Sequence, residues 1–134
     1  MGVVTYLMII IQIFILSMIA LVSCDTSNDH FQPTPHQMME GKSSYVIDGG
    51  TFYFSFDHGK VKVRLSEVDV PDMKEKNGFE SYEFLRNLIH QKTVKIEFLN
   101  VDSNGRWIAN VNLENGENVQ EKVRARNWIT HPNH

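Results

Sequence analysis

Two arginines and several carboxylates are concentrated in three short segments of this chain. The segments are Val46–Thr51, Arg64–Asp72 and Asp102–Arg106, and their reactive residues are Asp48, Arg64, Asp69, Asp72 and Arg106. A guanidinium group offers parallel N–H donors to phosphate oxygens, and carboxylates hold divalent cations or accept a proton from water. Together these residue types could hold a divalent cation, activate a water molecule and stabilise a phosphodiester transition state.

Alternating apolar residues predict the strands that must position these segments. In Val61–Leu65, for example, Val61, Val63 and Leu65 alternate with Lys62 and Arg64, so Arg64 points away from the apolar face. The predicted strands are Ser44–Ile47, Thr51–Phe56, Val61–Leu65, Thr93–Phe98 and Trp107–Leu113. Turn-forming residues separate the strands, including the Asp-Gly-Gly run that ends at Gly50.

Two stretches change to a helical period. Phe79–His90 carries an apolar stripe opposite a polar face, and Val119–Trp128 is long enough for a short closing helix. The order is three strands, a helix, two strands and a short helix. We therefore expect a β-rich α+β fold, a five-stranded Greek-key barrel of the OB type with one main helix and a short C-terminal helix; a small α+β sandwich is the alternative.

From about Tyr45 to Trp128 the pattern resembles the staphylococcal nuclease (thermonuclease-like) family. The resemblance implies that Arg64 and Arg106 bind the scissile phosphate, and that Asp69 and the backbone carbonyl of Val70 ligate Ca²⁺. It also places Asp72 where the family has a glutamate that orients or deprotonates the attacking water. Aspartate is one C–C bond shorter, roughly 1.5 Å, a difference to which general-base geometry is sensitive.

Gly50 is the main departure from the family pattern. The resemblance implies a second metal-binding carboxylate at this position, whereas the chain has Gly49 and Gly50 in succession. Calcium affinity falls as charged ligands are removed, so we expect weakened binding of Ca²⁺ or another divalent cation. Asp48 is a further candidate ligand, because the glycine turn is permissive.

The N-terminal region has the pattern of a lipoprotein signal peptide. Residues 1–23 carry no charged side chain, and the apolar run ends in Leu-Val-Ser before Cys24. We expect residues 1–23 to be the signal peptide and Cys24 to be lipidated, which anchors the protein on the extracytoplasmic face of the cell membrane. An uncleaved anchor and ordinary cleavage are the alternatives.

Composition predicts a tether followed by one domain. Residues 24–42 would contain the lipidated cysteine and a flexible tether, and residues 43–134 a single small domain. Because Cys24 is the only cysteine, no disulfide can form within the chain. We expect a monomer.

Net charge gives no long-range attraction for nucleic acid. The chain has 13 basic and 16 acidic residues, a formal charge of −3, so attraction must be local. The runs Lys60–Arg64 and Lys122–Arg126 could form a basic patch or simply solvated faces. We expect a membrane-tethered, metal-dependent phosphodiesterase acting on DNA or RNA; the alternatives are an inactive module that binds nucleic acid or a protein, and a lipoprotein in which the fold is only a scaffold.

Overall fold

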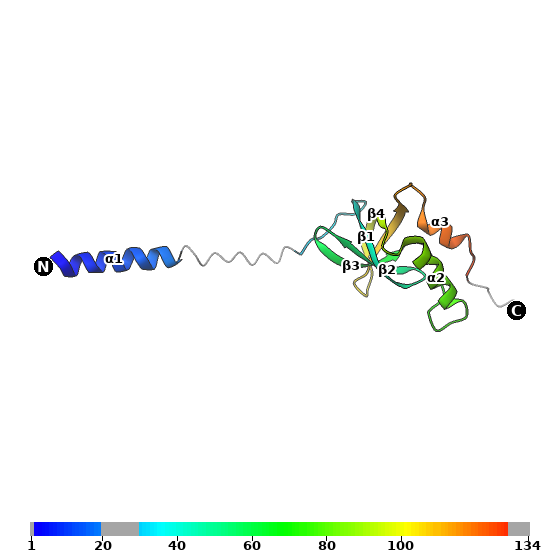
Figure 1. Cartoon of the computed structure of the whole chain (residues 1–134), viewed down its shortest axis with the longest axis horizontal. Helices are drawn as coiled ribbons and strands as arrows, with labels where there is room; N and C mark the ends of the chain where they lie inside the picture. The colour runs from blue at the N-terminus through cyan, green and yellow to red at the C-terminus, as the bar shows by residue number, and fades with distance from the viewer. Residues whose placement is uncertain (1, 20–29, 129–134) are drawn as a thin grey trace. The chain divides into compact units, whose positions relative to one another are not determined.

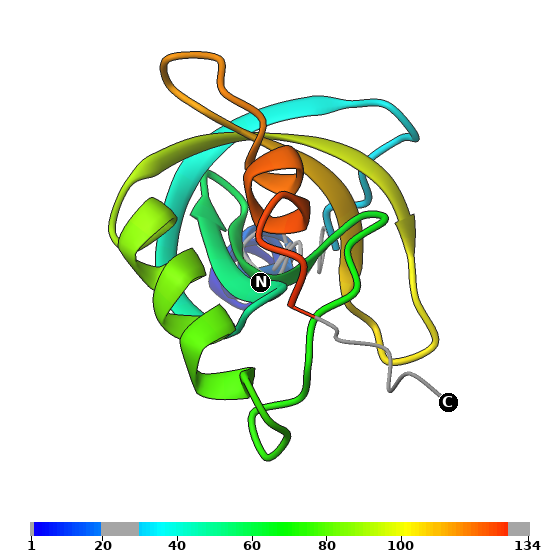
Figure 2. The ribbon, with the colours of Figure 1, turned by 90° about the vertical axis from the view of Figure 1, so that its right-hand side faces the viewer.

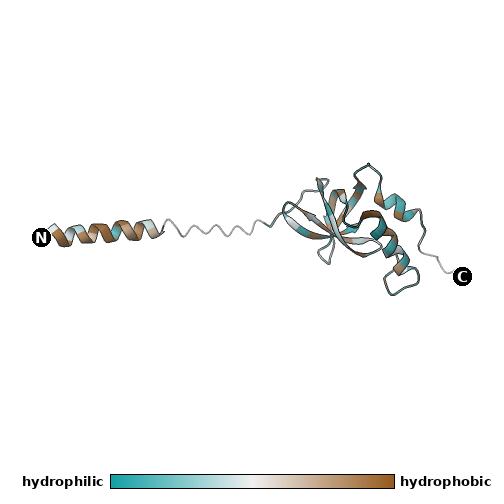
Figure 3. Cartoon of the chain, in the orientation of Figure 1, coloured by the Kyte–Doolittle hydropathy of each residue, from teal (hydrophilic) through white to brown (hydrophobic). Residues whose placement is uncertain are grey.

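The computed structural model describes residues 2–19 and 30–128 of the chain (Figure 1). It divides into two compact units, and the second begins at Phe31. The first unit contains α1, Gly2–Ile19, which carries apolar side chains around its whole circumference and no charged residue (Figure 3). Within the described residues, no helix is both long enough and apolar enough to span a membrane. Cys24 and the residues just before it lie outside the described part.

The second unit is a closed five-stranded barrel (Figure 2), which confirms the predicted fold class. The strands are β1 (Met38–Asp48), β2 (Thr51–Phe56), β3 (Gly59–Leu65), β4 (Thr93–Val101) and β5 (Trp107–Leu113). Their order around the barrel is β1-β2-β3-β5-β4. All neighbouring pairs are antiparallel except β3 and β5, which pair in parallel.

Two helices cover one end of the barrel (Figure 2). The main helix, α2 (Gly78–Ile89), buries Ser81, Leu85 and Ile89 on the face toward the barrel. The short helix, α3 (Val119–Arg124), begins after Asn118, whose side chain accepts a hydrogen bond from the Glu121 N–H. It ends four residues earlier than the sequence pattern predicted.

Alternation within the strands forms the core. Phe52, Phe54, Val63, Ile96 and Val111 are all fully buried, and the residues between them face outward. The core therefore fixes which side chains each strand presents on the outer face of the barrel.

The predicted tether was too long at its C-terminal end. Residues 38–42 belong to β1 and pair with β4, for example Met39 with Ile96. Upstream, Phe31 stacks on His58 with ring centroids 4.1 Å apart and also contacts Phe56. Polar residues and prolines concealed this segment in the sequence, although backbone pairing and the side chains of Phe31, His36 and Met39 attach it to the barrel.

Candidate active site

The turn between β1 and β2 is fixed by close backbone packing. The Asp48 Oδ1 atom accepts the Gly50 N–H at 2.8 Å, and the Gly50 carbonyl accepts the Leu65 N–H at 2.8 Å. A Cβ atom on Gly49 would lie 2.5 Å from the Ser81 Oγ atom, so α2 packs directly on a turn that has no side chain there. The end of β3 and the start of α2 therefore converge on this turn.

Position 50 faces several of the residues predicted for the site. A Cβ atom built on Gly50 would lie 3.1 Å from Val70 Cγ2, 3.7 Å from Arg64 Nη1 and 3.9 Å from Asp48 Oδ1. Gly50 is also absent from the residues with positive φ, so its backbone conformation accepts a side chain. The structure thus brings Asp48, Gly50, Arg64 and Val70 together.

Arg64 and Arg106 lie on the same outer face of the barrel. Arg64 pairs with Ile108 in the parallel β3–β5 ladder, while their neighbours Val63 and Trp107 point into the core. Arg106 precedes Ile108 by two residues, so strand alternation places it on the Arg64 face. Strand spacing and rise put the two Cα atoms roughly 8 Å apart, a separation suited to binding one phosphate group from two sides.

Asp102 holds Arg106 within the β4–β5 turn. Its Oδ2 atom accepts the Arg106 Nε–H at 2.7 Å, and its Oδ1 atom accepts the backbone N–H groups of Asn104 and Arg106 at 2.9 Å. Burial of the Asp102 carboxyl group raises its pKa, but the hydrogen bonds from Arg106 and Asn104 outweigh this effect and hold the pKa below its ordinary value. The carboxylate therefore stays charged and keeps Arg106 in place.

Both guanidinium groups keep N–H donors that no atom of residues 2–19 and 30–128 accepts. Among the described residues, Arg64 makes no side-chain hydrogen bond or ion pair, and Arg106 uses only its Nε–H group. The two side chains are half-buried, so solvent or a ligand can reach their donors while the surrounding residues limit their movement. Such uncommitted guanidinium donors are what bidentate phosphate binding needs.

The loop after β3 carries the two remaining predicted site residues. Asp69 is exposed and precedes the half-buried Val70. Asp72 is also exposed; its Oδ1 atom accepts the Lys74 N–H at 3.1 Å, and its carbonyl accepts the Glu75 N–H at 2.9 Å. The Asp72 carbonyl packs so closely on Gly78 that no side chain would fit there, which fixes the loop against the start of α2.

The acidic side chains present provide only part of a calcium site. Across residues 2–19 and 30–128, no three Asp, Glu, His or Cys side chains are grouped so that they could hold a metal ion. Position 50, which lies beside Val70, Arg64 and Asp48, contributes no carboxylate. A calcium site takes six to eight oxygen ligands, so the described residues offer few charged ones.

The role of Asp102 and the exposure of Tyr45 were not predicted from the sequence. The spacing of Asp102 to Arg106 within the turn could have indicated the ion pair. The exposure of Tyr45 could have been predicted by extending strand alternation from the buried Val46 to its neighbour.

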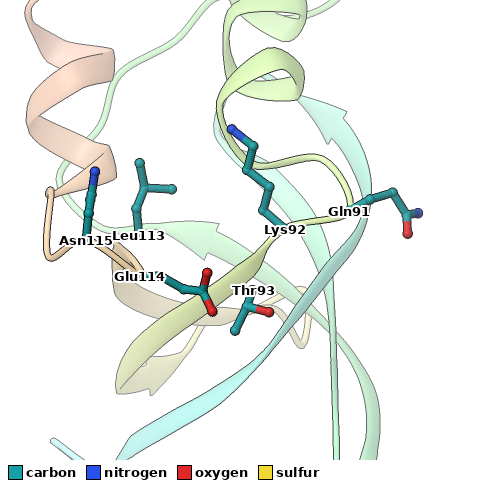
Figure 4. A pocket seen from close by; sticks show the side chains of 6 residues that line it. All are labelled: Gln91, Lys92, Thr93, Leu113, Glu114 and Asn115. Carbon is teal, nitrogen blue, oxygen red and sulfur yellow. The ribbon is translucent and has the colours of Figure 1, made fainter.

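A hollow of about 460 Å³ lies at the opposite end of β5 from Arg106 (Figure 4). It is lined by residues including Lys92 and Glu114 and contains none of the predicted site residues.

Comparison with known proteins finds similarity to a nuclease family. Residues 62–125 match the family described as staphylococcal nuclease homologue, a stretch that includes both arginines, Asp69 and Asp72 but not the turn at Gly50. The chain is also 31% identical over 88 residues to two proteins described as uncharacterized endonucleases, from Escherichia coli O157:H7 and Escherichia coli. Each match covers 65% of this chain and 58% of the relative.

Proposed function

Because the barrel of this chain is a staphylococcal nuclease-like domain, we propose that it is a metal-dependent phosphodiesterase of nucleic acid with a weakened cation site. The observation that carries the proposal is the pair of arginines on one outer face. Arg64 lies on β3 and Arg106 directly precedes the neighbouring strand β5, and both keep guanidinium donors that no described protein atom accepts.

The two arginines would bind the phosphodiester group and stabilise its transition state. Their donors would hold the non-bridging oxygens and neutralise the negative charge that grows on them as water attacks phosphorus. Asp102 would keep Arg106 oriented throughout, so that little reorganisation accompanies the reaction. Asp72 is exposed on the loop after β3 and would accept a proton from the attacking water.

The cation site is the weak part of this proposal. A bound divalent cation would supply Lewis-acid charge neutralisation at the phosphate, with Asp69, the Val70 carbonyl and Asp48 as its nearest protein ligands. The absence of a carboxylate at Gly50 lowers the expected affinity. This same observation favours the second candidate function, a catalytically inactive module that binds nucleic acid through the two arginines.

We further propose that the domain is tethered to the membrane and faces the extracytoplasmic side. The Leu-Val-Ser sequence before Cys24 and the uncharged, apolar α1 support a lipidated N-terminus. A monomer suffices for the site, because both arginines come from the same barrel.

Cleavage and binding assays on the full chain in non-ionic detergent test the proposal. Wild type should nick plasmid DNA or cut RNA with Ca²⁺, Mg²⁺ or Mn²⁺ and lose activity in EDTA. Arg64→Ala and Arg106→Ala should each reduce the cleavage rate about 100-fold or more. Arg86→Ala removes an exposed arginine from α2 and should change little.

The outcomes separate the two candidate functions. Cleavage that depends on both arginines supports the phosphodiesterase. Nucleic-acid binding that depends on them, without cleavage under any metal condition, supports the inactive module. If the folded wild-type protein neither binds nor cleaves nucleic acid, both candidate functions are contradicted.

A further inference from the structure

Three rows of paired residues cross β1, β2 and β3. The first row contains Asp48, the buried Thr51 and Arg64, the second contains Tyr45, Tyr53 and Lys62, and the third contains Lys42, Ser55 and Lys60. Alternate residues along a strand are about 6.7 Å apart, so Arg64, Lys62 and Lys60 form a line of cations at that spacing. We define the outer track as Lys42, Tyr45, Tyr53, Lys60 and Lys62.

The cations of the outer track are not neutralised by the protein. In the part of the chain that the structure describes, Lys42, Lys60 and Lys62 form no ion pair with an acidic side chain. Glu40 lies beyond the track on β1 and pairs with Lys95 at 3.9 Å. A protein with a net charge of −3 thus keeps a local positive surface beside Arg64.

Two tyrosines lie at the centre of the outer track. Tyr45 and Tyr53 are directly opposite each other on β1 and β2, with ring centroids 6.5 Å apart. Tyr45 is 55% exposed, an unusual position for so large an apolar ring. The Lys60 and Lys62 Nζ atoms lie 4.7 and 5.6 Å from the Tyr53 ring centroid, so the lysines are held around the aromatic pair.

A bulge in β1 fixes this presentation. The register between β1 and β2 shifts between Ser43 and Tyr45, and the Ser44 hydroxyl donates to the Tyr53 carbonyl at 3.3 Å. The Ser55 hydroxyl in turn donates to the Ser44 hydroxyl at 3.1 Å. Bulges re-aim side chains, and here the shift sets Tyr45 opposite Tyr53 on the outer face.

We propose that the outer track binds single-stranded nucleic acid and guides the strand toward Arg64. Lys42, Lys60 and Lys62 contact successive phosphates, and the exposed Tyr45 ring stacks on a base. The inference rests on the proposed function, because the strand leads to the arginine pair. A duplex fits this surface less well, since its bases are already stacked and unavailable to Tyr45.

Oligonucleotide binding in EDTA tests the outer track without cleavage. Fluorescence anisotropy would measure the affinity of the full chain, in non-ionic detergent, for labelled oligothymidylate and for a duplex of equal length. Tyr45→Ala should weaken single-strand binding about 5- to 100-fold, whereas Tyr45→Phe keeps the ring and the affinity. The double variant Lys60→Gln/Lys62→Gln should reduce the salt dependence of the binding constant by about 1.4 logarithmic units per decade of salt, or 0.7 per phosphate contact.

Matched controls come from elsewhere on the domain. Phe79 on α2 is 56% exposed, nearly the same as Tyr45, and Phe79→Ala should leave binding unchanged. Lys92→Gln removes an exposed lysine outside the track and should likewise have no effect. Circular dichroism confirms that each variant is folded.

Each outcome decides between the track and the arginine site. If wild type binds through Arg64 and Arg106 but Tyr45→Ala binds equally well, the outer track is wrong and the proposed function stands. If folded wild type binds no oligonucleotide, both fail. If polyglutamate displaces the oligonucleotide and Tyr45→Ala has no effect, the surface recognises polyanions such as acidic protein segments, which also overturns the proposal.

Discussion

The Asp102 carboxylate binds Arg106 at two atoms, the backbone N–H at 2.9 Å and the Nε–H at 2.7 Å. This geometry orients the guanidinium group while leaving both of its terminal nitrogens without a partner in the described residues. An ion pair that used the terminal nitrogens would instead compete with phosphate. Asp102 is therefore a positioning residue for the proposed phosphate contact.

Replacing Asp102 by asparagine should weaken oligonucleotide binding only when Arg106 is present. Asp102→Asn retains an oxygen for the backbone N–H groups but loses the charge that holds the guanidinium. We expect roughly tenfold weaker oligonucleotide binding, equivalent to about 1.4 kcal/mol. In the Arg106→Ala background the same change should have no effect, and an equal loss in both backgrounds would show that Asp102 acts only through turn stability.

A carboxylate introduced at Gly50 should strengthen cation binding. Gly50→Asp would direct its side chain toward Asp48 and Val70, with Arg64 nearby, and Val70 must move by a few tenths of an ångström to admit it. We expect calcium affinity to rise about 10- to 100-fold, measured by calorimetric titration, with a parallel gain in plasmid nicking. Gly50→Asn supplies the same shape without the charge, and equal affinity for Ca²⁺ in the two folded variants would contradict the missing-carboxylate explanation.

A charge placed at Ile96 should unfold the barrel. Ile96 is fully buried on β4, so Ile96→Asp would bury an unpaired carboxylate and cost several kcal/mol, comparable with the stability of a small domain. Ile96→Val leaves only a small cavity and should cost about 1 kcal/mol. Thermal unfolding followed by circular dichroism would distinguish them, and unchanged melting of Ile96→Asp would contradict the assigned core.

Stability should depend on the ionisation of Glu97. The side-chain hydrogen bond with His36 at 2.7 Å, and a second from Asn110 at 3.1 Å, lower the pKa of Glu97 from its ordinary value of 4.5. Because the folded-state pKa is the lower one, the stabilisation is present above about pH 4.5 and is lost as the pH falls through the folded-state pKa.

Urea unfolding at a series of pH values measures this dependence. Wild type should exceed Glu97→Gln in free energy of unfolding at neutral pH, and the difference should shrink under acid conditions. Glu83→Gln, which removes an exposed carboxyl on α2, should show no comparable trend. A difference between wild type and Glu97→Gln that stays constant with pH would rule out ionisation as its cause.

Lipidation should require Cys24. Cys24→Ser removes the only thiol in the chain, so metabolic labelling with a fatty acid should mark wild type and not the variant. The variant should also leave the membrane fraction if its signal peptide is cleaved by another route. Equal labelling of both proteins would refute the anchor.

Strand alternation was sufficient to predict the barrel and the outward position of Arg64, because burial of one strand face fixes the other. The start of β1 was not predictable in this way. Residues 38–42 pair with β4 through backbone groups, which leave little trace in side-chain polarity. The helix α3 was overestimated because its pattern continues beyond Arg124, whereas Asn127 adopts a left-handed conformation that ends helical structure.

The candidate site was predictable in its residues but not in their contacts. Spacing and family resemblance indicated Arg64, Arg106 and the acids around them. The Asp102–Arg106 ion pair is local and has a spacing signal in the sequence. The closeness of position 50 to Arg64 and Val70, in contrast, depends on how separate strands and loops meet. Contacts between segments distant in sequence have no local signal, so a single sequence reveals them only through the fold.

The site depends on the parallel pairing of β3 with β5. Three registered residue pairs join these strands, which are distant in sequence, and together with the β1–β4 pairing this seam closes the barrel. Because non-local contacts must first overcome the entropy of loop closure, we expect both pairings to form after the local hairpins. Arg64 and Arg106 become neighbours only when the seam closes, so phosphate binding reports completion of the barrel. Opening of the seam would abolish binding while the β1–β2–β3 meander remained intact.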